Sequence, residues 1–485
     1  MSLGDTIRGG VRWVVAGKIG HGFLQFALSI VLARLLMPTD FGLLVTVQIF
    51  TGIAGFVAGG GMGQALVQAK TVQPRDTHVV FTAQLCICIV IYLMFFMISP
   101  VFAAWFDEPQ YENLLRVSAL TFLIRPFANV PNSLLHHAMR YKANAFINIV
   151  ILSVTGTTSV SLALLGFGVW SLVLGGIAGG LTNVVLAMSV SKWTPRLAFD
   201  MPILRRFANY GIKVTLNDIV VYLRNQSSNF VVSRFIGTEA VGLFNKAASL
   251  NQKPRGLLSG SAYHVVFRAM SKTQENLDQS KYIYLRTITL VSVYALPFYV
   301  GLWWVAEPFI VTVYGAHWAA SAPILKILVF TALVDIINNQ SGAVTAARRL
   351  LGRELLVQVG SWAILIAAIV VGYRWGSSGV AWAVVFASVP YALLMARIAC
   401  RELRVSARDM WNAVKPALLL NTVLALGLWL VDTLLTDEIA SIPAAYLLSM
   451  SAAGGLLYTV CFLYLPIPAV RKEAERWKSR LRLSR

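Results

Sequence analysis

The side chains best suited to bind a ligand are charged groups that fall inside otherwise apolar stretches of the chain. In residues 207–236 they follow the 3.6-residue period of a helix in two adjacent stripes. The first stripe consists of Lys213, Asn217, Arg224 and Ser228, and the second of Asp218, Tyr222, Asn225 and Asn229. In residues 240–264, Lys246 and Lys253 share one helix face, with Arg255 close by. Five basic groups against one acid predict a cationic site for an anion such as phosphate or pyrophosphate.

Two carboxylates, Asp218 and Asp335, also lie deep within apolar stretches. A carboxyl group removed from water can take up a proton or bind Na⁺, so both residues are candidates for coupling to an ion gradient. Asp335 shares a helix face with Asn338 and Asn339, and a hydrogen-bonded contact between helices explains that face equally well. In the first 200 residues, Arg125 is the charged group that lies deepest within an apolar stretch.

The elements that carry these groups are predicted to be membrane-spanning helices. Of the 485 residues, 57% are hydrophobic and only 13% are charged, whereas soluble domains average about 25% charged residues. The apolar runs reach about 20 residues, the length that spans a bilayer as a helix, and they lack the alternation of barrel strands.

A charge at the centre of a bilayer costs about 2.5–3.5 kcal/mol, so such a residue usually faces a wet cavity. This reasoning supports a cavity role for Arg224 and Lys253, which lie in the middle of their spans. Other interpretations stay open for residues near span ends. Lys213 and Lys246 are close enough to reach the membrane surface, and Asp218 is free to pair with an arginine on a neighbouring helix.

Fourteen membrane spans are predicted from the apolar runs. In chain order they cover residues 11–36, 41–66, 78–100, 113–136, 144–166, 169–191, 207–236, 240–264, 283–306, 320–345, 354–373, 377–400, 411–434 and 442–465.

The net charge of +20, from 41 Lys and Arg against 21 Asp and Glu, is predicted to mark cytoplasmic loops and not a nucleic-acid site. Basic clusters alternate along the chain with acidic loops, as loops on alternating sides of a membrane should, and fourteen spans place both termini on the same side. The basic clusters include Lys192, Arg196, Arg205 and Arg206; Arg348, Arg349 and Arg353; and Arg397, Arg401, Arg404 and Arg408. The acidic loops contain Asp107, Glu108 and Glu112, and then Asp432, Asp437 and Glu438. We therefore expect a multi-pass inner-membrane protein with both termini in the cytoplasm.

The chain repeats itself with an offset of 200 residues. Arg34 followed by Gly42-Leu43 matches Arg234 followed by Gly242-Leu243. Both copies begin on the same side of the membrane, so the repeat is parallel, and its symmetry axis runs along the membrane normal. We expect two six-helix lobes, residues 1–200 and 201–410, then a helix pair at 411–467 and a basic cytoplasmic tail at 468–485. Such repeats are typical of transporters that rock their lobes around a substrate path.

Catalytic and metal-binding patterns are missing from the sequence. Cys86 and Cys88 do not have the spacing of a metal or redox motif. The histidines are scattered, and no loop is long enough to form a catalytic domain. We therefore expect a transporter and not an enzyme, with no cofactor and no metal.

The segment VLARLLMPTDFGLL, which begins at Val31, and GMGQALVQ, which begins at Gly61, resemble the opening of polysaccharide flippases. These are the Wzx-like O-antigen and exopolysaccharide transporters of the superfamily of multidrug and lipid-linked oligosaccharide exporters. The resemblance implies movement of a polyprenyl-pyrophosphate-linked oligosaccharide to the external leaflet by alternating access, coupled to an H⁺ or Na⁺ gradient. It also implies that membrane lipids, a polysaccharide polymerase and export machinery are partners, and nucleic acid is not.

Within this resemblance, Lys213, Asn217, Arg224, Lys246, Lys253 and Arg255 are expected to bind the head group, with Arg125 facing them. The alternatives are a multidrug antiporter of the same superfamily and a membrane polysaccharide polymerase. Cationic drugs require buried acids, and the first span has none after Asp5. A polymerase requires a large external loop, which the sequence lacks.

Overall fold

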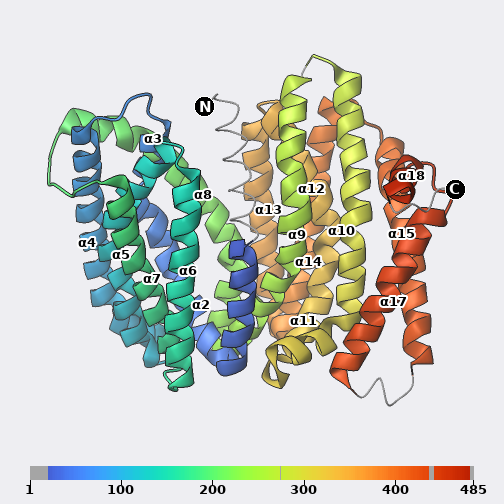
Figure 1. Ribbon diagram of the computed structural model, residues 1–485, viewed down its shortest axis with the longest axis horizontal. Coiled ribbons are helices and arrows are strands. Elements are labelled where there is room, and N and C mark those ends of the chain that lie inside the picture. Colours follow the sequence, from blue (N-terminus) through green and yellow to red (C-terminus); the bar gives the residue numbers. More distant parts are fainter. Residues whose placement is uncertain (1–19, 274, 436–441, 481–485) are drawn as a thin grey trace. The chain divides into compact units, whose positions relative to one another are not determined.

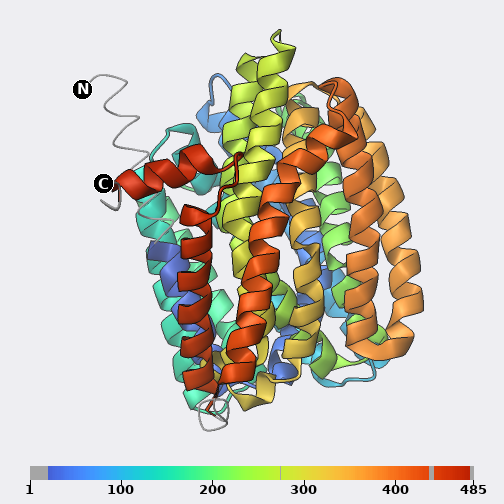
Figure 2. The same cartoon turned by 90° about the vertical axis from the view of Figure 1, so that its right-hand side faces the viewer.

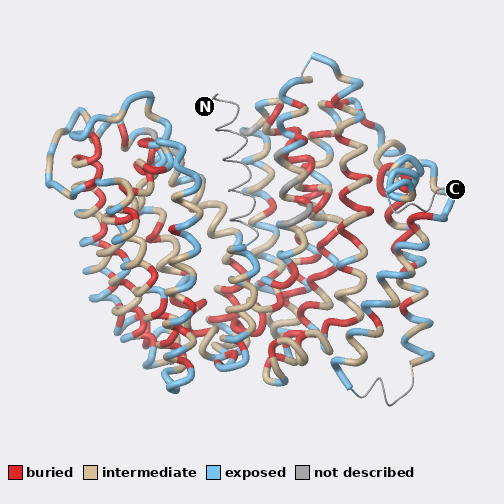
Figure 3. The backbone as a smooth tube through the Cα atoms, viewed as in Figure 1, coloured by how far each residue is buried: buried red, intermediate tan, exposed pale blue. Residues whose placement is uncertain are grey.

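Every regular element of the described chain is a helix. The computed structural model describes residues 20–273, 275–435 and 442–480 (Figure 1). Within these residues, nine helical segments are long and apolar enough to span a bilayer. Exposed positions recur along whole helices and not only at their ends (Figure 3). Many of them are large apolar side chains, such as Val90, Met97, Leu448 and Leu456, which lipid would cover. The prediction of an all-α polytopic membrane protein is confirmed.

Each of the fourteen predicted spans has a helical counterpart, the first of them seen from Gly20 to Leu35. Contacts within the chain define two compact units, Met1–Gly242 and Leu243–Arg485. The first unit contains α2 (Pro38–Gly59), α3 (Met62–Gln68), α4 (Pro74–Trp105), α5 (Gln110–His137), α6 (Tyr141–Leu164), α7 (Val169–Ser191) and α8 (Met201–Phe235). Helix α9 (Thr238–Lys272) begins in the first unit and continues in the second. The lobe limits predicted at residues 200, 410 and 467 stay predictions.

The second unit continues with α10 (Leu277–Tyr314), α11 (Ser321–Leu328), α12 (Ala332–Ala347), α13 (Leu351–Gly372), α14 (Gly376–Glu402), α15 (Ala407–Leu434), α17 (Pro443–Tyr464) and α18 (Arg471–Arg480). Helices α11 and α12 form one span, joined by the short turn Val329–Thr331. Figure 2 shows α15 and α17 in orange and red, with α18 running at a steep angle to α17. Helices α9 and α10 are longer than the predicted spans 240–264 and 283–306, so that α10 begins soon after α9 ends.

Acidic side chains fix the starts of several helices. The carboxylates of Asp40, Asp76 and Asp409 each accept a hydrogen bond from a backbone N–H three residues earlier, at 2.9–3.0 Å. Asp200 caps α8 by accepting from the N–H of Ile203 at 3.2 Å. Because the first N–H groups of a helix have no partner inside it, these contacts define where the spans begin.

The second predicted span, residues 41–66, is not continuous. Gly60 and Gly61 have φ angles of 54° and 60°, a left-handed conformation that ends α2 before α3 begins. The break packs directly against α8, since a Cβ atom on Gly61 would overlap the backbone of Gly211. A single helix was predicted because the run of apolar residues continues through the two glycines, and hydropathy carries no information on backbone conformation.

The starts of α2 and α9 touch each other in a two-fold symmetric way. A Cβ atom on Gly42 would overlap the carbonyl oxygen of Thr238, and one on Gly242 would overlap that of Pro38. A shift of 200 residues converts either contact into the other. The glycines are therefore needed for the close approach of these two helices, and the register of the predicted repeat holds at this point.

Candidate functional site

Arg125 lies near the middle of α5 and extends toward α2. Its Nη1 atom occupies the space that a side chain on Gly55 would need, because a Cβ atom there would lie 2.5 Å from it. Farther along α2, Gly59 has no neighbour within 4 Å of its Cβ position. Arg125 is nevertheless exposed. A charge near the middle of a membrane helix is stable only beside water or a counter-charge, so we infer that α2 and α5 border a wet region of the first unit.

Helix α8 meets the same helix through Tyr222. The Tyr222 hydroxyl donates a hydrogen bond to the carbonyl oxygen of Gln48 at 2.6 Å. Its ring fills the space beside Gly52, one helical turn before Gly55. The glycines of α2 thus accommodate a phenol from α8 and a guanidinium from α5. Tyr222 was noted in the sequence only as part of a polar stripe, and its partner on α2 was not predicted.

The other predicted site residues of α8 are only partly described. Arg224 and Asp218 are half-buried. The side chains of Lys213 and Asn217 lie outside the part of the chain that the structure describes. Their assignment to the head-group site, like that of Asp218 to ion coupling, stays a prediction.

In the second unit, the structure brings together two residues that the sequence placed in different roles. Nη1 of Arg255 on α9 lies 3.2 Å from Oδ1 of Asp335 on α12. The two side chains keep 38% and 21% of their surface exposed, so this ion pair is reachable by water. Lys253, two residues earlier on α9, is exposed as well.

Lys246 has a different environment, nearer the start of α9. Its Nζ atom lies 4.0 Å from the ring centre of Tyr314 and 4.8 Å from that of Trp318. Both aromatic rings are buried, which makes the pair a cage for a cation. Neither aromatic residue was predicted as part of a site, because both lie beyond the end of the apolar run that the sequence assigns to the ninth span.

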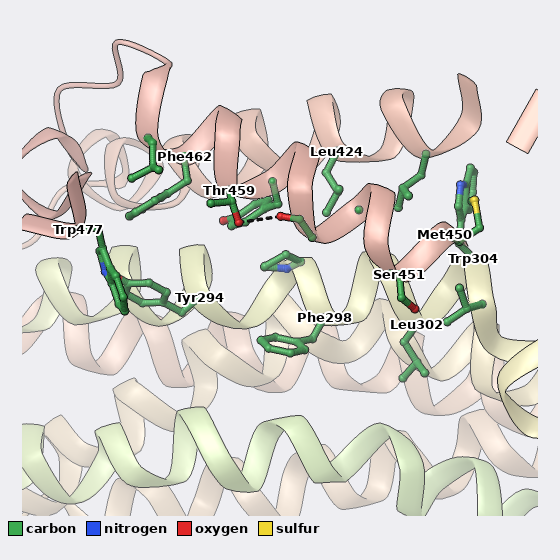
Figure 4. A pocket seen from close by; sticks show the side chains of 18 residues that line it. Tyr294, Phe298, Leu302, Trp304, Leu424, Met450, Ser451, Thr459, Phe462 and Trp477 are labelled. Atoms are coloured by element: carbon green, nitrogen blue, oxygen red, sulfur yellow. Dashed lines mark hydrogen bonds between the residues drawn. The ribbon is translucent and has the colours of Figure 1, made fainter. Parts of the chain in front are cut away.

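An apolar cavity lies among α10, α15 and α17 (Figure 4). Its volume is about 640 Å³. Tyr294 and Trp477 lie at one end and Trp304 and Met450 at the other, with Phe298 between them. Trp477 belongs to α18, and its indole N–H donates to the Tyr294 hydroxyl at 3.1 Å. The cavity was not predicted from the sequence, because glycines and aromatic residues on separate helices leave no periodic signal.

Helix α18 is held to α10 by an ion pair and hydrogen bonds, near the end of the cavity at which Tyr294 and Trp477 lie. Arg286 on α10 forms an ion pair with Glu473 at 3.1 Å and also donates to the carbonyl oxygen of Ala469. Glu473 accepts a second contact from Arg476 at 3.0 Å. The basic tail predicted at 468–485 is therefore a helix over Arg471–Arg480.

Metal chemistry finds no support within residues 20–273, 275–435 and 442–480, where no three His, Cys, Asp or Glu side chains are grouped closely enough to hold an ion. The four cysteines carry free thiols. The arrangement instead offers guanidinium and ammonium groups near the middle of long helices, and such groups are able to bind anions through charge-assisted hydrogen bonds.

Cysteine accessibility tests the wet character of both regions. In a chain whose natural cysteines are replaced by serine, Arg125→Cys and Arg255→Cys should react with a water-soluble, membrane-impermeant thiol reagent. Val130→Cys on α5 and Ala247→Cys on α9 are the matched controls, because both positions are fully buried. The controls should stay unlabelled. If the two mid-helix positions react no faster than the controls, the water-filled regions do not exist.

Known proteins resemble this chain in sequence and in fold. The family model described as "Polysaccharide biosynthesis protein" matches residues 31–323. The succinoglycan biosynthesis transport protein ExoT of Rhizobium meliloti is 26% identical over 67% of this chain, and the aligned region spans 65% of ExoT. The teichuronic acid biosynthesis protein TuaB of Bacillus subtilis is 22% identical over the full length of both chains.

Among solved structures, the lipid II flippase MurJ in its inward closed conformation shares the fold. The TM-score is 0.71 at 14% identity, covering 92% of this chain and 97% of MurJ. At this identity, the similarity extends to the fold alone. Because the family model matches more than half of the sequence, the chain belongs to the polysaccharide biosynthesis protein family, and its predicted relationship to the polysaccharide flippases is confirmed.

Proposed function

We propose that the protein moves a polyprenyl-pyrophosphate-linked oligosaccharide from the cytoplasmic to the external leaflet of the inner membrane by alternating access. The observation that carries the proposal is the set of basic side chains that lie at mid-membrane positions and remain exposed, foremost Arg125 and Arg255. The function named for ExoT, succinoglycan transport, supports a substrate of this class.

The physical task of such a carrier is to bring a diphosphate through the low-dielectric part of the membrane. An anion that leaves water needs counter-charges already in place. Arginine supplies them best, because its guanidinium binds phosphate oxygens in pairs. In this proposal Arg125, Arg224, Lys246, Lys253 and Arg255 neutralise the head group, together with Lys213 and Asn217. An H⁺ or Na⁺ gradient supplies the driving force, with Asp218 and Asp335 as the coupling carboxylates.

The polyprenyl chain needs a different environment, and the apolar cavity of the second unit supplies one. Its lining runs along α10 from Tyr294 to Val305, a distance of about 16 Å in a helix. A branched hydrocarbon of several isoprene units fits this length and the aromatic walls. The cavity is bordered by the additional helix pair α15 and α17, which gives that pair a role in holding the lipid tail.

The proposed orientation has both termini in the cytoplasm, with a polysaccharide polymerase and export machinery acting on the product. Basic residues gather where α4 and α8 begin and α5 and α7 end. Arg75 pairs with Asp200 at 3.1 Å, and Arg140 donates to the carbonyl oxygen of Val190, near the end of α7, at 3.1 Å. Acidic residues such as Asp107 and Glu112 lie at the opposite ends of α4 and α5. This asymmetry supports a cytoplasmic basic face.

A multidrug antiporter is the competing function. Such a carrier binds cationic drugs and therefore needs an acidic group facing its cavity. The described part of the first span, Gly20–Leu35, contains no Asp or Glu, and the mid-span carboxylate Asp335 is paired with Arg255. The charge balance therefore favours an anionic substrate.

Complementation of a flippase-deficient strain tests the proposal together with the role of Arg125. The wild-type gene should restore polymer, whereas Gly55→Val should reduce transport by about tenfold or more, because it displaces the guanidinium from its place on α2. Gly59→Val is the matched control on the same helix, since its Cβ position is open. It should transport normally. Equal transport by the two variants at equal membrane levels would remove Arg125 from the mechanism.

A cavity-filling substitution tests the site of the lipid tail. Gly301 on α10 lines the cavity and has open space at its Cβ position, so Gly301→Phe should fold and occupy the tail site. We expect transport to fall by about tenfold or more as apolar contact with the chain is lost. Gly360→Phe on α13 places the same ring in open space away from the cavity and should leave transport unchanged. A fully active Gly301→Phe protein would place the tail elsewhere.

A further inference from the structure

The ion pair of Arg255 and Asp335 is the middle rung of a polar ladder between two spans. Four residues earlier on α9, Asn251 Nδ2 donates a hydrogen bond to Thr331 Oγ1 at 3.2 Å. Four residues later on α9, Ser259 Oγ accepts a hydrogen bond from Asn339 Nδ2 at 2.8 Å. Each rung joins residue i of α9 to residue i+80, and successive rungs are four residues apart. The two helix faces therefore run parallel, in a single register, with one charged rung between two neutral ones.

The neutral rungs hold the helices in place independently of the ion pair. Asn251 and Ser259 are buried, and the carbonyl oxygen of Asn251 also accepts a hydrogen bond from Tyr299 of α10 at 3.2 Å. Hydrogen bonds of this kind between side chains of packed helices fix their register in a membrane. The charged rung can therefore open by side-chain rotation alone, without separation of α9 from α12.

The ion pair of Arg255 and Asp335 lies near the middle of the membrane, where removing two charges from water costs more free energy than it usually returns. Arg255 lies midway between the two ends of α9, and Asp335 lies near the middle of the span formed by α11 and α12. A pair sealed from solvent would be buried, yet these side chains keep 38% and 21% of their surface exposed. The pair therefore borders water, and an anion dissolved in that water can reach the guanidinium.

A carboxylate and a phosphate oxygen bind a guanidinium through the same donors and geometry. Both cannot occupy the same edge of Arg255. A diphosphate carries more negative charge than one carboxylate, so it is the stronger partner for the guanidinium of Arg255. Charge and geometry together allow the substrate head group to replace Asp335.

From these observations we propose that Asp335 is a built-in substitute for the substrate diphosphate, which holds Arg255 when the carrier is empty and is displaced when the head group binds. This inference rests on the proposed function and assigns a role to the pairing itself. Asp335 neutralises Arg255 while the empty carrier resets, and it competes with the head group so that product is released. It is a positioning residue, since it acts on substrate only through Arg255.

Pyrophosphate binding to the purified full-length protein in nanodiscs tests the exchange. Asp335→Asn keeps the size of the side chain and removes its charge, so pyrophosphate should bind at least about fivefold more tightly. Arg255→Gln should weaken binding by about tenfold or more. The double variant should behave like Arg255→Gln, because the proposed exchange is a competition between Asp335 and the ligand for Arg255. Glu112→Gln removes a carboxylate from the ion pair with Arg116 and should bind as the wild type does.

A transport measurement separates this role from a structural one. Asp335→Asn should flip lipid-linked substrate more slowly while binding pyrophosphate more tightly, a combination that a damaged protein would not give. Asp335→Glu restores the charge and should restore both values. Unchanged or weaker pyrophosphate binding by Asp335→Asn would overturn the exchange while leaving the flippase function standing. A wild-type protein that neither binds pyrophosphate nor restores polymer would overturn both.

Discussion

Charge at the centre of a bilayer is the constraint on which the rest of this protein depends. Such charge is stable only beside water or a counter-charge. The three long helices α5, α8 and α9 fall outside the nine segments that are apolar enough to span a membrane unaided. They also carry most of the basic groups proposed to bind the head group. These helices accordingly need apolar neighbours on their lipid side and polar contacts on their inner side.

Small residues and polar ladders supply the inner contacts. Gly42 and Gly242 bring the starts of α2 and α9 within backbone distance, and Gly52 and Gly55 make room for a phenol and a guanidinium. Hydrogen bonds likewise join α9, a helix with several charged residues, to the span formed by α11 and α12. Without a hydrophobic driving force between helices in lipid, close packing and hydrogen bonds are what remain to join them. The helix faces that pack against neighbouring helices are therefore the same faces that carry the proposed binding groups.

The sequence predicts the membrane spans because the length of an apolar run is compared with the thickness of the bilayer. That comparison requires no knowledge of the neighbouring helices. For the same reason the sequence predicts Arg125, Arg224 and Lys253 as charges that lie within membrane spans. The break at Gly60 and Gly61 was missed, since an apolar run continues across it. The pairing of Arg255 with Asp335 was also missed, because the two lie 80 residues apart and only the packed helices bring them together. The aromatic cage of Lys246 and the cavity beside α17 likewise exist only in the tertiary structure.

The central claim is that wet, mid-membrane cations recognise the diphosphate of a lipid-linked substrate. Affinity measurements in nanodiscs with polyprenyl diphosphate, polyprenyl monophosphate and uncharged polyprenol of equal chain length test this claim most directly. Affinity should fall stepwise along this series, and rising salt should weaken diphosphate binding but not polyprenol binding. If polyprenol binds as tightly as the diphosphate at every salt concentration, the cations do not recognise the head group and the account is contradicted.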